Sequence, residues 1–298
     1  MTSAAALAAE PVPARPCLVC AHTGHVRFRE DRGYEILRCT ACGLRFLHPQ
    51  PSAAELDAFY AEQYFRSGDS VSTGYDSYAD EAANWRATFR DRLKHLPTPR
   101  PGQRLLDVGA AAGYFVEQAR AAGWDAEGVE PSRWAASYAR DRLGMPVREG
   151  TLESAAYGPG TFDIVTLWEV IEHLADPRTF LGEVARVLKP GGLIALSTPD
   201  AGSTAARLSG NRWLGWRKIP EHLFFFDRPS LARLFDQAGF DVIDHRYVTL
   251  TVTWGFALQR LGALVGMPAL GHVPSWVGDR SVRINCYYDL MMVGKRRA

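Results

Sequence analysis

The residues with the clearest chemical potential lie in the segment LLDVGAAAGYF, from Leu105 to Phe115, and in EGVEPS further along the chain. A buried apolar strand leads into a turn of small residues and then into a helix. Gly109 and Gly113 let a ligand lie against bare backbone at the helix N-terminus. Glu130 follows a second apolar strand, where a carboxylate would accept hydrogen bonds from ribose hydroxyls. This combination predicts a nucleotide-type cofactor site.

The spacing of the glycines indicates which cofactor fits. A dinucleotide fingerprint needs glycines at positions one, three and six. Here Gly109 and Gly113 occupy positions one and five, while Ala111 and Tyr114 occupy positions three and six, so a pyrophosphate site is excluded. Asp107 places a carboxylate beside the turn, where it would repel a phosphate and hold an ammonium group. S-adenosylmethionine carries an ammonium group and no phosphate, so it is the predicted cofactor.

Four segments in order, D-x-G-x-A-x-G, VEPS, FDIVTLWEVIEHLADP and LKPGGLIALSTP, resemble a class I S-adenosylmethionine-dependent methyltransferase over roughly residues 100–295. The resemblance implies an α/β fold with a doubly wound, Rossmann-like, seven-stranded sheet. It departs at Ala111, where the family usually has glycine. The resemblance also places Trp168 and Glu169 at the methionine end of the cofactor. The residues expected to bind the cofactor are Asp107, Gly109, Ala111, Gly113, Tyr114, Phe115, Glu130, Pro131, Thr151, Leu152, Trp168 and Glu169.

Four cysteines near the start of the chain have the spacing of metal ligands. They form two Cys-x2-Cys pairs separated by eighteen residues, namely Cys17, Cys20, Cys39 and Cys42. This spacing predicts a structural zinc site with four thiolate ligands. Two disulfides are the alternative, which a reducing compartment disfavours. Because four thiolates leave no open coordination position, we expect the Zn²⁺ ion to fold its own subdomain, a lid or docking module, and to take no part in the chemistry.

The pair Glu221-His222 is the predicted source of a general base. A histidine in a pocket loop has a pKa near neutrality, and an adjacent carboxylate can orient it. The order of parts resembles that of zinc-ribbon-bearing C-methyltransferases of deoxysugar biosynthesis, in which the histidine of a Glu-His pair serves as base. Those enzymes carry a further C-terminal domain beyond the point where this sequence stops, so their sugar-nucleotide substrate is not carried over. The alternative is that His222 only packs or caps a helix. Glu172 and His173 are expected to be structural.

These residues need elements that position them, and the pattern along the chain predicts three units. Residues 14–50 form the zinc ribbon, 51–100 a helical lid and linker, and 101–298 the methyltransferase domain. In the third unit apolar strands alternate with helical stretches, which predicts a parallel sheet with an antiparallel edge. The predicted strands cover residues 104–108, 125–129, 145–148, 162–167, 192–197, 240–248 and 284–294. The candidate lid residues are Tyr60, Tyr64, Tyr75 and Tyr78, and Cys286 is expected to be a buried core thiol.

Composition argues against several function classes. The 298 residues include 34 Lys and Arg against 33 Asp and Glu, and a net charge of +1 leaves no electrostatic footprint for nucleic acid. No segment offers about eighteen uninterrupted apolar residues for a transmembrane helix. The N-terminus lacks the basic start of a signal peptide. We therefore expect a cytoplasmic protein that does not bind nucleic acid. Its oligomeric state is open, with a homodimer as one option.

Clues to the acceptor come from composition. The strand that ends at Trp168 lacks the Asp/Asn-Pro-Pro-Tyr/Phe pattern of enzymes that methylate nucleobase amino groups or glutamine amides. Trp213, Trp216 and nearby phenylalanines could line an apolar pocket, and the insert 248–276 could cover it, form a dimer surface or lie on a membrane. We expect C- or O-methylation of a small natural-product, sugar-derived or polysaccharide-linked acceptor. The alternatives are a prenyl, quinone or other lipid-like acceptor, and a non-catalytic zinc-ribbon scaffold.

Overall fold

A computed structural model of the chain describes residues 16–52, 55, 82–265, 267, 274–285 and 288–298. The predicted lid tyrosines Tyr60, Tyr64, Tyr75 and Tyr78, together with Cys286, lie outside the described residues. Within the part of the chain that is described, none of the helices has the length and apolar character needed to cross a lipid bilayer.

Seven strands form the central sheet. Their bounds are β4 (Arg104–Val108), β5 (Asp125–Glu130), β6 (Val147–Glu149), β7 (Phe162–Trp168), β8 (Leu188–Pro199), β10 (Phe240–Tyr247) and β13 (Asp289–Arg296). The spatial order is β10-β13-β8-β7-β4-β5-β6. The five strands from β8 to β6 run parallel, whereas β13 pairs antiparallel with both β8 and β10. This arrangement confirms the predicted doubly wound, Rossmann-like sheet and brings the carboxyl ends of β4, β5, β7 and β8 to one edge.

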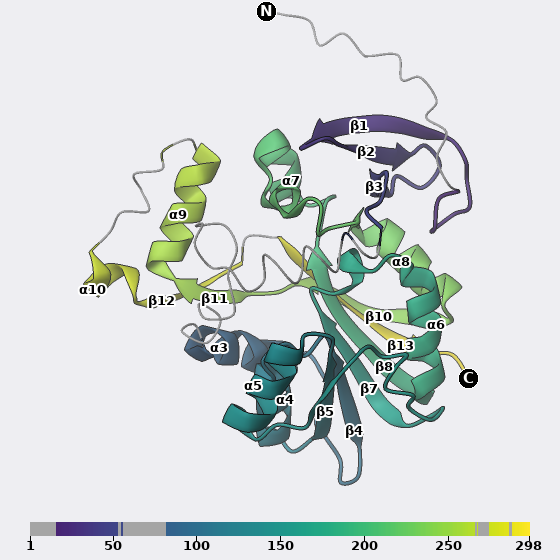
Figure 1. The fold of residues 1–298 in the computed structure, drawn as a ribbon, viewed down its shortest axis with the longest axis vertical. Coiled ribbons are helices and arrows are strands. Elements are labelled where there is room, and N and C mark those ends of the chain that lie inside the picture. Colours follow the sequence, from purple (N-terminus) through teal and green to yellow (C-terminus); the bar gives the residue numbers. More distant parts are fainter. Residues whose placement is uncertain (1–15, 53–54, 56–81, 266, 268–273, 286–287) are drawn as a thin grey trace, which may run out of the picture.

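Helices cover both faces of this sheet (Figure 1). They are α3 (Ala82–Leu93), α4 (Tyr114–Ala121), α5 (Arg133–Leu143), α6 (Pro177–Val187) and α8 (Arg228–Gln237). Successive side chains of a strand point to opposite faces, so Leu105 packs in the core beneath α4 and α5, while Leu106 packs in the core beneath α6 and α8. Local capping sets where two helices begin: the side chains of Ser132 and Asp227 accept backbone hydrogen bonds at the starts of α5 and α8.

One predicted strand is wrong in its bounds. The sequence predicted a single strand over residues 284–294, whereas the structure has β12 (Ser281–Ile284) and then β13, which begins at Asp289. β12 leaves the central sheet and pairs with β11 (Leu250–Thr253). Helices α9 (Trp254–Val265) and α10 (Ser275–Gly278) lie between them, so the apolar insert projects from the sheet as a separate layer (Figure 1).

A second sheet lies beyond the carboxyl end of the central one. It has the order β1-β2-β3-β9, and β9 follows the short helical segments after β8. The bounds are β1 (His25–Asp31), β2 (Tyr34–Cys39), β3 (Arg45–His48), α7 (Thr204–Ser209), η2 (Gly210–Arg212), η3 (Leu214–Lys218) and β9 (Phe224–Phe225). The buried side chains of this sheet belong to the same hydrophobic core as those beneath α6 and α8. The cysteine-bearing strands therefore have no separate core of their own.

Candidate active site

The turn between β4 and α4 has the backbone shape that the glycine pattern predicted. Gly109, Ala111 and Gly113 have φ values of 73°, 45° and 82°, a region that L side chains rarely adopt. A Cβ atom on Gly109 would lie 2.6 Å from Cγ2 of Val170, and one on Gly113 would lie 2.9 Å from the Cβ of Ala139. Both glycines are therefore required by conformation and by packing, whereas Ala111 accommodates its methyl group.

Two buried carboxylates flank this turn. Asp107 is 2% exposed and accepts a hydrogen bond from the Thr166 hydroxyl at 2.7 Å; burial raises its pKa to about 8. The Oε2 and Oε1 atoms of Glu130 accept backbone hydrogen bonds from Ala111 at 2.9 Å and Ser132 at 2.8 Å. The predicted ribose-binding carboxylate thus also holds the turn. Because each carboxylate oxygen has two acceptor sites, both can still accept a ribose hydroxyl.

The other predicted cofactor residues are distributed around the same edge. Tyr114 and Phe115 begin α4 and are buried, and the Phe115 ring lies 5.0 Å from that of Trp168 between ring centroids. Leu152 is buried beyond β6, whereas Pro131 and Thr151 are exposed. The predicted cofactor residues therefore lie on the turn, on the loops after β5 and β6 and at the end of β7.

Trp168 and Glu169 end the neighbouring strand β7. Glu169 has a φ of 56°, and its carboxylate accepts a hydrogen bond from the Ser197 hydroxyl at 2.8 Å. Its burial, with the nearby carboxylates of Asp289 and Glu172, raises its pKa well above the ordinary value. A non-glycine residue in this backbone region is held there by its surroundings and marks a candidate functional position.

Arg92 of α3 enters the same region, and sequence reasoning missed it. The side chain is 3% exposed, its guanidinium lies 5.1 Å over the Trp168 ring, and Nη2 is 3.6 Å from Asp289 Oδ2. Among the described residues, its Nε and Nη1 atoms have no hydrogen-bond partner, and neither does Trp168 Nε1. Buried donors of this kind are suited to an anionic ligand group. Helical periodicity offered one signal, because Arg92 follows the apolar Phe89 by three residues on the buried face.

His222 is buried beside a different carboxylate from the one the sequence favoured. Its Nε2 atom lies 4.0 Å from Glu172 Oε1, and its ring packs edge-on against His173 at 4.7 Å. Burial, with His173 and Lys218 nearby, holds the His222 pKa well below its usual value, which favours the neutral imidazole. The Glu221 carboxylate instead lies 3.6 Å from Lys218 Nζ. Glu172, expected to be structural, is thus the carboxylate that the structure brings to His222.

Glu172 is itself in an unusual environment. One carboxylate oxygen, Oε2, accepts a hydrogen bond from the Thr198 hydroxyl at 2.9 Å, while Oε1 has no hydrogen-bond partner among the described residues. Burial raises the Glu172 pKa to about 8. The ligand atoms of Glu172, His173 and His222 lie within 4.8 Å of one another. Glu172 and His222 therefore form a buried pair of titratable groups, in which burial raises the pKa of the carboxyl group and lowers that of the imidazole.

The four predicted zinc ligands lie together. The Sγ atoms of Cys17 and Cys42 are 3.5 Å apart, and those of Cys20 and Cys39 are 3.4 Å apart. The four cysteines are free thiols in the structure, and these sulfur–sulfur distances are longer than a disulfide bond. Ligand sulfurs of a tetrahedral zinc site are separated by about 3.8 Å. A hydrogen bond from Cys42 lowers the Cys17 pKa to about 5. The cluster is geometrically suited to one Zn²⁺ ion.

The aromatic residues proposed to line an acceptor pocket are mostly buried. Trp213, Trp216 and Phe224–Phe226 pack in the core that the β1-β2-β3-β9 sheet shares with the central sheet. Trp254, at the start of α9, is 41% exposed. The buried members of this set, Trp213, Trp216 and Phe224–Phe226, therefore pack around the His222 segment.

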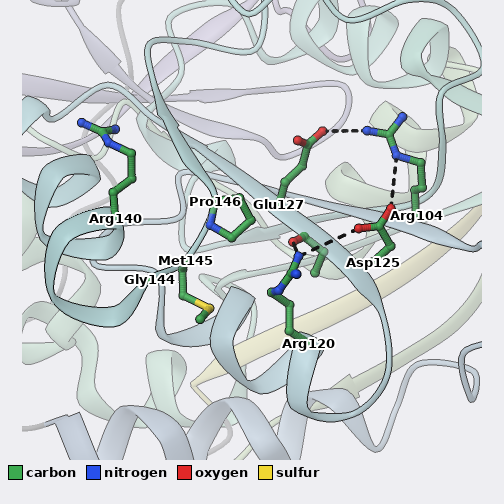
Figure 2. A pocket seen from close by; sticks show the side chains of 9 residues that line it. Arg104, Arg120, Asp125, Glu127, Arg140, Gly144, Met145 and Pro146 are labelled. Atoms are coloured by element: carbon green, nitrogen blue, oxygen red, sulfur yellow. Dashed lines mark hydrogen bonds and ion pairs between the residues drawn. The ribbon is translucent and has the colours of Figure 1, made fainter.

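A hollow of about 480 Å³ lies at the opposite edge of the central sheet (Figure 2). It is lined by Arg104 and Asp125, where β4 and β5 begin, and by Arg120, Glu127 and residues 144–146. Its arginines already pair with neighbours: Arg104 contacts Glu127 at 3.0 Å and Asp125 at 3.8 Å. Since ligands of open α/β sheets bind at the carboxyl ends of the strands, this hollow is separate from the candidate active site.

Comparison with known proteins shows which family the chain resembles. Residues 75–245 match a family model described as a methyltransferase domain. The chain is 32% identical over 180 residues to a ubiquinone biosynthesis O-methyltransferase of Cereibacter sphaeroides (strain ATCC 17025), covering 57% of this chain and 73% of that protein.

Two solved structures are similar in fold. The YcgJ protein of Bacillus subtilis gives a TM-score of 0.52 at 20% identity, covering 71% of this chain and 99% of that one. A Haemonchus contortus phosphoethanolamine N-methyltransferase 2, solved with phosphomonomethylethanolamine and S-adenosylhomocysteine, gives 0.57 at 16% identity, covering 83% and 62%.

Proposed function

This chain belongs to the S-adenosylmethionine-dependent methyltransferase family, and from that premise we propose that it methylates a hydroxyl group of a quinone-like or other aromatic small molecule. The observation that carries the proposal is the buried, neutral His222 at the sheet edge that bears the cofactor turn. The identity to a ubiquinone biosynthesis O-methyltransferase favours a hydroxylated ring over a sugar-derived acceptor. Carbon methylation of a sugar-derived acceptor is the competing outcome of the experiment below.

The residues around the turn fit S-adenosylmethionine, which when bound supplies an electrophilic methyl group on a sulfonium. The bare backbone at Gly109 and Gly113 leaves room for the ligand, and Glu130 has acceptor sites for ribose hydroxyls. Asp107 supplies the negative charge for the ammonium group. The free donors of Arg92 would hold the methionine carboxylate. The site therefore offers one partner of suitable charge for each polar end of the cofactor.

His222 is proposed to accept the proton of the acceptor hydroxyl at Nε2. Glu172 Oε1 lies 4.0 Å from this atom, and this oxygen would accept a hydrogen bond from the imidazolium that forms. The proton gained by the imidazole replaces the positive charge lost from the sulfonium, so the net charge of the buried site does not change. Alignment of the acceptor supplies most of the acceleration, since the base adds a smaller factor.

Two further parts of the molecule receive roles in this proposal. The four-cysteine cluster would hold a structural Zn²⁺ ion whose closed coordination keeps it out of the chemistry.

The insert exposes Trp254 and Trp276, which are 41% and 70% exposed. Tryptophan is suited to the interface between water and lipid, so peripheral contact with a bilayer would bring a lipid-tailed acceptor near the site. Flotation with anionic and neutral liposomes tests that contact.

The first experiment measures S-adenosylhomocysteine binding by calorimetry in the wild type and in Asp107→Ala and Glu130→Ala. Binding that both variants lose supports the site. Absence of binding to folded wild-type protein would favour the scaffold alternative. The second experiment offers dihydroxylated quinol and nucleotide-sugar acceptors and locates the new methyl group by mass spectrometry. Methylated quinol oxygen, lost in His222→Asn with cofactor affinity retained, supports the proposal; methylated sugar carbon overturns the choice of acceptor.

A further inference from the structure

The fourth strand of the cysteine-bearing sheet comes from the opposite half of the chain. β9 pairs antiparallel with β3, with Phe46 opposite Phe224 and Arg45 opposite Phe225. It begins two residues after His222, so the sheet that carries the predicted metal site is completed by the segment that carries the proposed base. An isolated two-residue strand has no independent stability. β9 therefore depends on β3 for its conformation.

Hydrogen bonds hold this segment from two sides. On the ribbon side, Leu47 donates its N–H to the carbonyl of Leu223 at 2.9 Å, and the Arg32 guanidinium donates to the carbonyl of Ile219 at 2.6 Å. On the other side, the Leu223 N–H donates to the carbonyl of Glu172 at 2.9 Å. The Leu223 peptide thus lies between the ribbon and the Glu172 turn, adjacent to His222. This peptide therefore connects the ribbon to the turn that bears Glu172.

The predicted metal ligands lead directly into this contact. Cys39 ends β2, and the backbone of residues 39–44 closes on itself through Gly43 N–H to Cys39 O at 3.0 Å and Cys39 N–H to Leu44 O at 2.9 Å. Arg45, the first residue of β3, follows at once. Phe46 and Leu47 share one buried core with Leu223 and Phe224. In the zinc-bound chain four Zn–S bonds would hold this knuckle, and removal of the metal would weaken the start of β3.

We propose that the ribbon positions His222, so that occupancy of the four-cysteine site sets the geometry of the proposed base, with Arg32 as a positioning residue that acts through the Ile219 carbonyl. This inference rests on the proposed function only for the role of His222. The physical reason is that a base must be held within a fraction of an ångström of its productive position. Residues 219–225 gain conformational freedom once β3 releases them.

Hydrogen exchange on the full chain tests the proposal without relying on activity. The protein is compared with and without a zinc chelator, and exchange is followed by mass spectrometry in peptides covering 45–48, 219–226 and 104–108. We expect chelation to speed exchange in the first two segments and to leave β4 protected, with S-adenosylhomocysteine affinity unchanged. Fast exchange in 45–48 with full protection of 219–226 would overturn the proposal.

Substitution of Arg32 gives a second test. It leaves the metal site intact and therefore remains informative if chelation unfolds the whole chain. Arg32→Ala should speed exchange in 219–226 and lower kcat by ~10-fold with KM and cofactor affinity retained, and Arg32→Lys should recover part of both. The matched control is Arg27→Ala, whose guanidinium pairs with Glu35 inside the ribbon. Equal exchange in the two alanine variants would overturn the positioning role. Faster exchange in Arg32→Ala with unchanged kcat would instead overturn His222 as the base.

Discussion

At the scale of single residues, the site combines carboxyl groups whose pKa values burial raises with an imidazole whose pKa burial lowers. The pKa values of Asp107 and Glu172 are raised to about 8 and that of Asp289 to about 6. A bound cation favours the ionised form of such a carboxyl group. A cationic ligand that binds beside these carboxyl groups should therefore ionise them and release protons near neutral pH.

Replacing Asp107 tests this at one position. Its pKa is about 8 in the folded state against 3.8 in the unfolded chain. The folded state therefore binds the extra proton, and the associated stability is present below pH ~4 and lost as the pH rises to ~8. Asp107→Asn keeps an acceptor for Thr166 but does not titrate. Relative to the wild type, its free energy of unfolding in urea should gain ~3 kcal/mol between pH 5 and pH 8.

The same variant should bind S-adenosylhomocysteine more weakly, because the ammonium group loses its anion. Val108→Ala, at the next and also buried position of β4, is the control for a change that does not titrate. Parallel pH profiles of stability in wild type and Asp107→Asn would contradict the prediction.

The roles of Glu172 and Glu221 can be distinguished by the pH dependence of kcat in variants of each residue. Glu172→Gln resembles the protonated carboxyl group and retains an acceptor for Thr198, so its kcat should match the wild type near pH 6. The variant should fall below the wild type as the pH passes about 8, where Glu172 ionises. Glu221→Gln is the matched control, because its carboxylate faces Lys218 and not His222. Initial rates from pH 5.5 to 9.5 decide the matter; a pH-dependent loss in Glu221→Gln alone would contradict the assignment.

At the scale of elements, the turn between β4 and α4 is defined by backbone conformation. Its three positive φ values bring the N–H of Ala111 to Glu130 and those of Gly109 and Ala110 to the Val129 carbonyl. The first turn of the α4 helix is thereby fixed to the end of β5. A ligand at this edge contacts two strands through one rigid turn.

Gly109→Ala should remove cofactor binding and lower the free energy of unfolding by ~1–3 kcal/mol. Two effects combine, since the new Cβ would lie 2.6 Å from Val170 Cγ2 and the φ of 73° is unfavourable for alanine. Gly144→Ala isolates the conformational effect from the steric one. The φ of Gly144 is 65°, and no atom lies within 4 Å of the new Cβ. Calorimetric titration and thermal unfolding of both variants provide the measurement. Equal losses of stability would show that conformation alone accounts for the glycine at position 109.

At the scale of the whole molecule, the ribbon and the central sheet share one core, which runs from Leu37 and Leu47 through Phe225 to Leu234. The sequence suggested a boundary near residue 50, but the buried contacts cross it. A shared core couples the two parts in global unfolding, while the ribbon and residues 219–226 can still open locally.

Leu37→Ala tests this cooperativity. Leu37 is fully buried in β2, and truncating it should cost ~2–5 kcal/mol through lost burial and a residual cavity. We expect one calorimetric transition at lower temperature, with exchange in β8 increased along with exchange in the ribbon. Arg27→Ala, on the exposed side of β1, should leave the transition temperature nearly unchanged. An early transition confined to the ribbon, with the main transition unmoved, would contradict a shared core.

The features that the sequence determined by itself depend on residues close together in the chain. The D-x-G-x-A-x-G turn depends on φ values that a few adjacent residues dictate, and the paired Cys-x2-Cys spacing brings two sulfurs of each pair together within one knuckle. The strands of the parallel sheet follow from apolar runs separated by helical stretches, which is why the predicted bounds of β4, β5 and β7 agree with the structure to within about one residue.

Only the tertiary structure decided which side chains meet. Glu221 and His222 are neighbours in sequence, yet their side chains find different partners, Lys218 and Glu172, because consecutive residues of a loop point in different directions. Arg92 reaches the site only through the packing of α3 across α4, and β9 joins the ribbon only because β3 offers it an open edge. These contacts join segments that lie far apart in the chain. Residue types and local spacing do not show which distant segments will pack together.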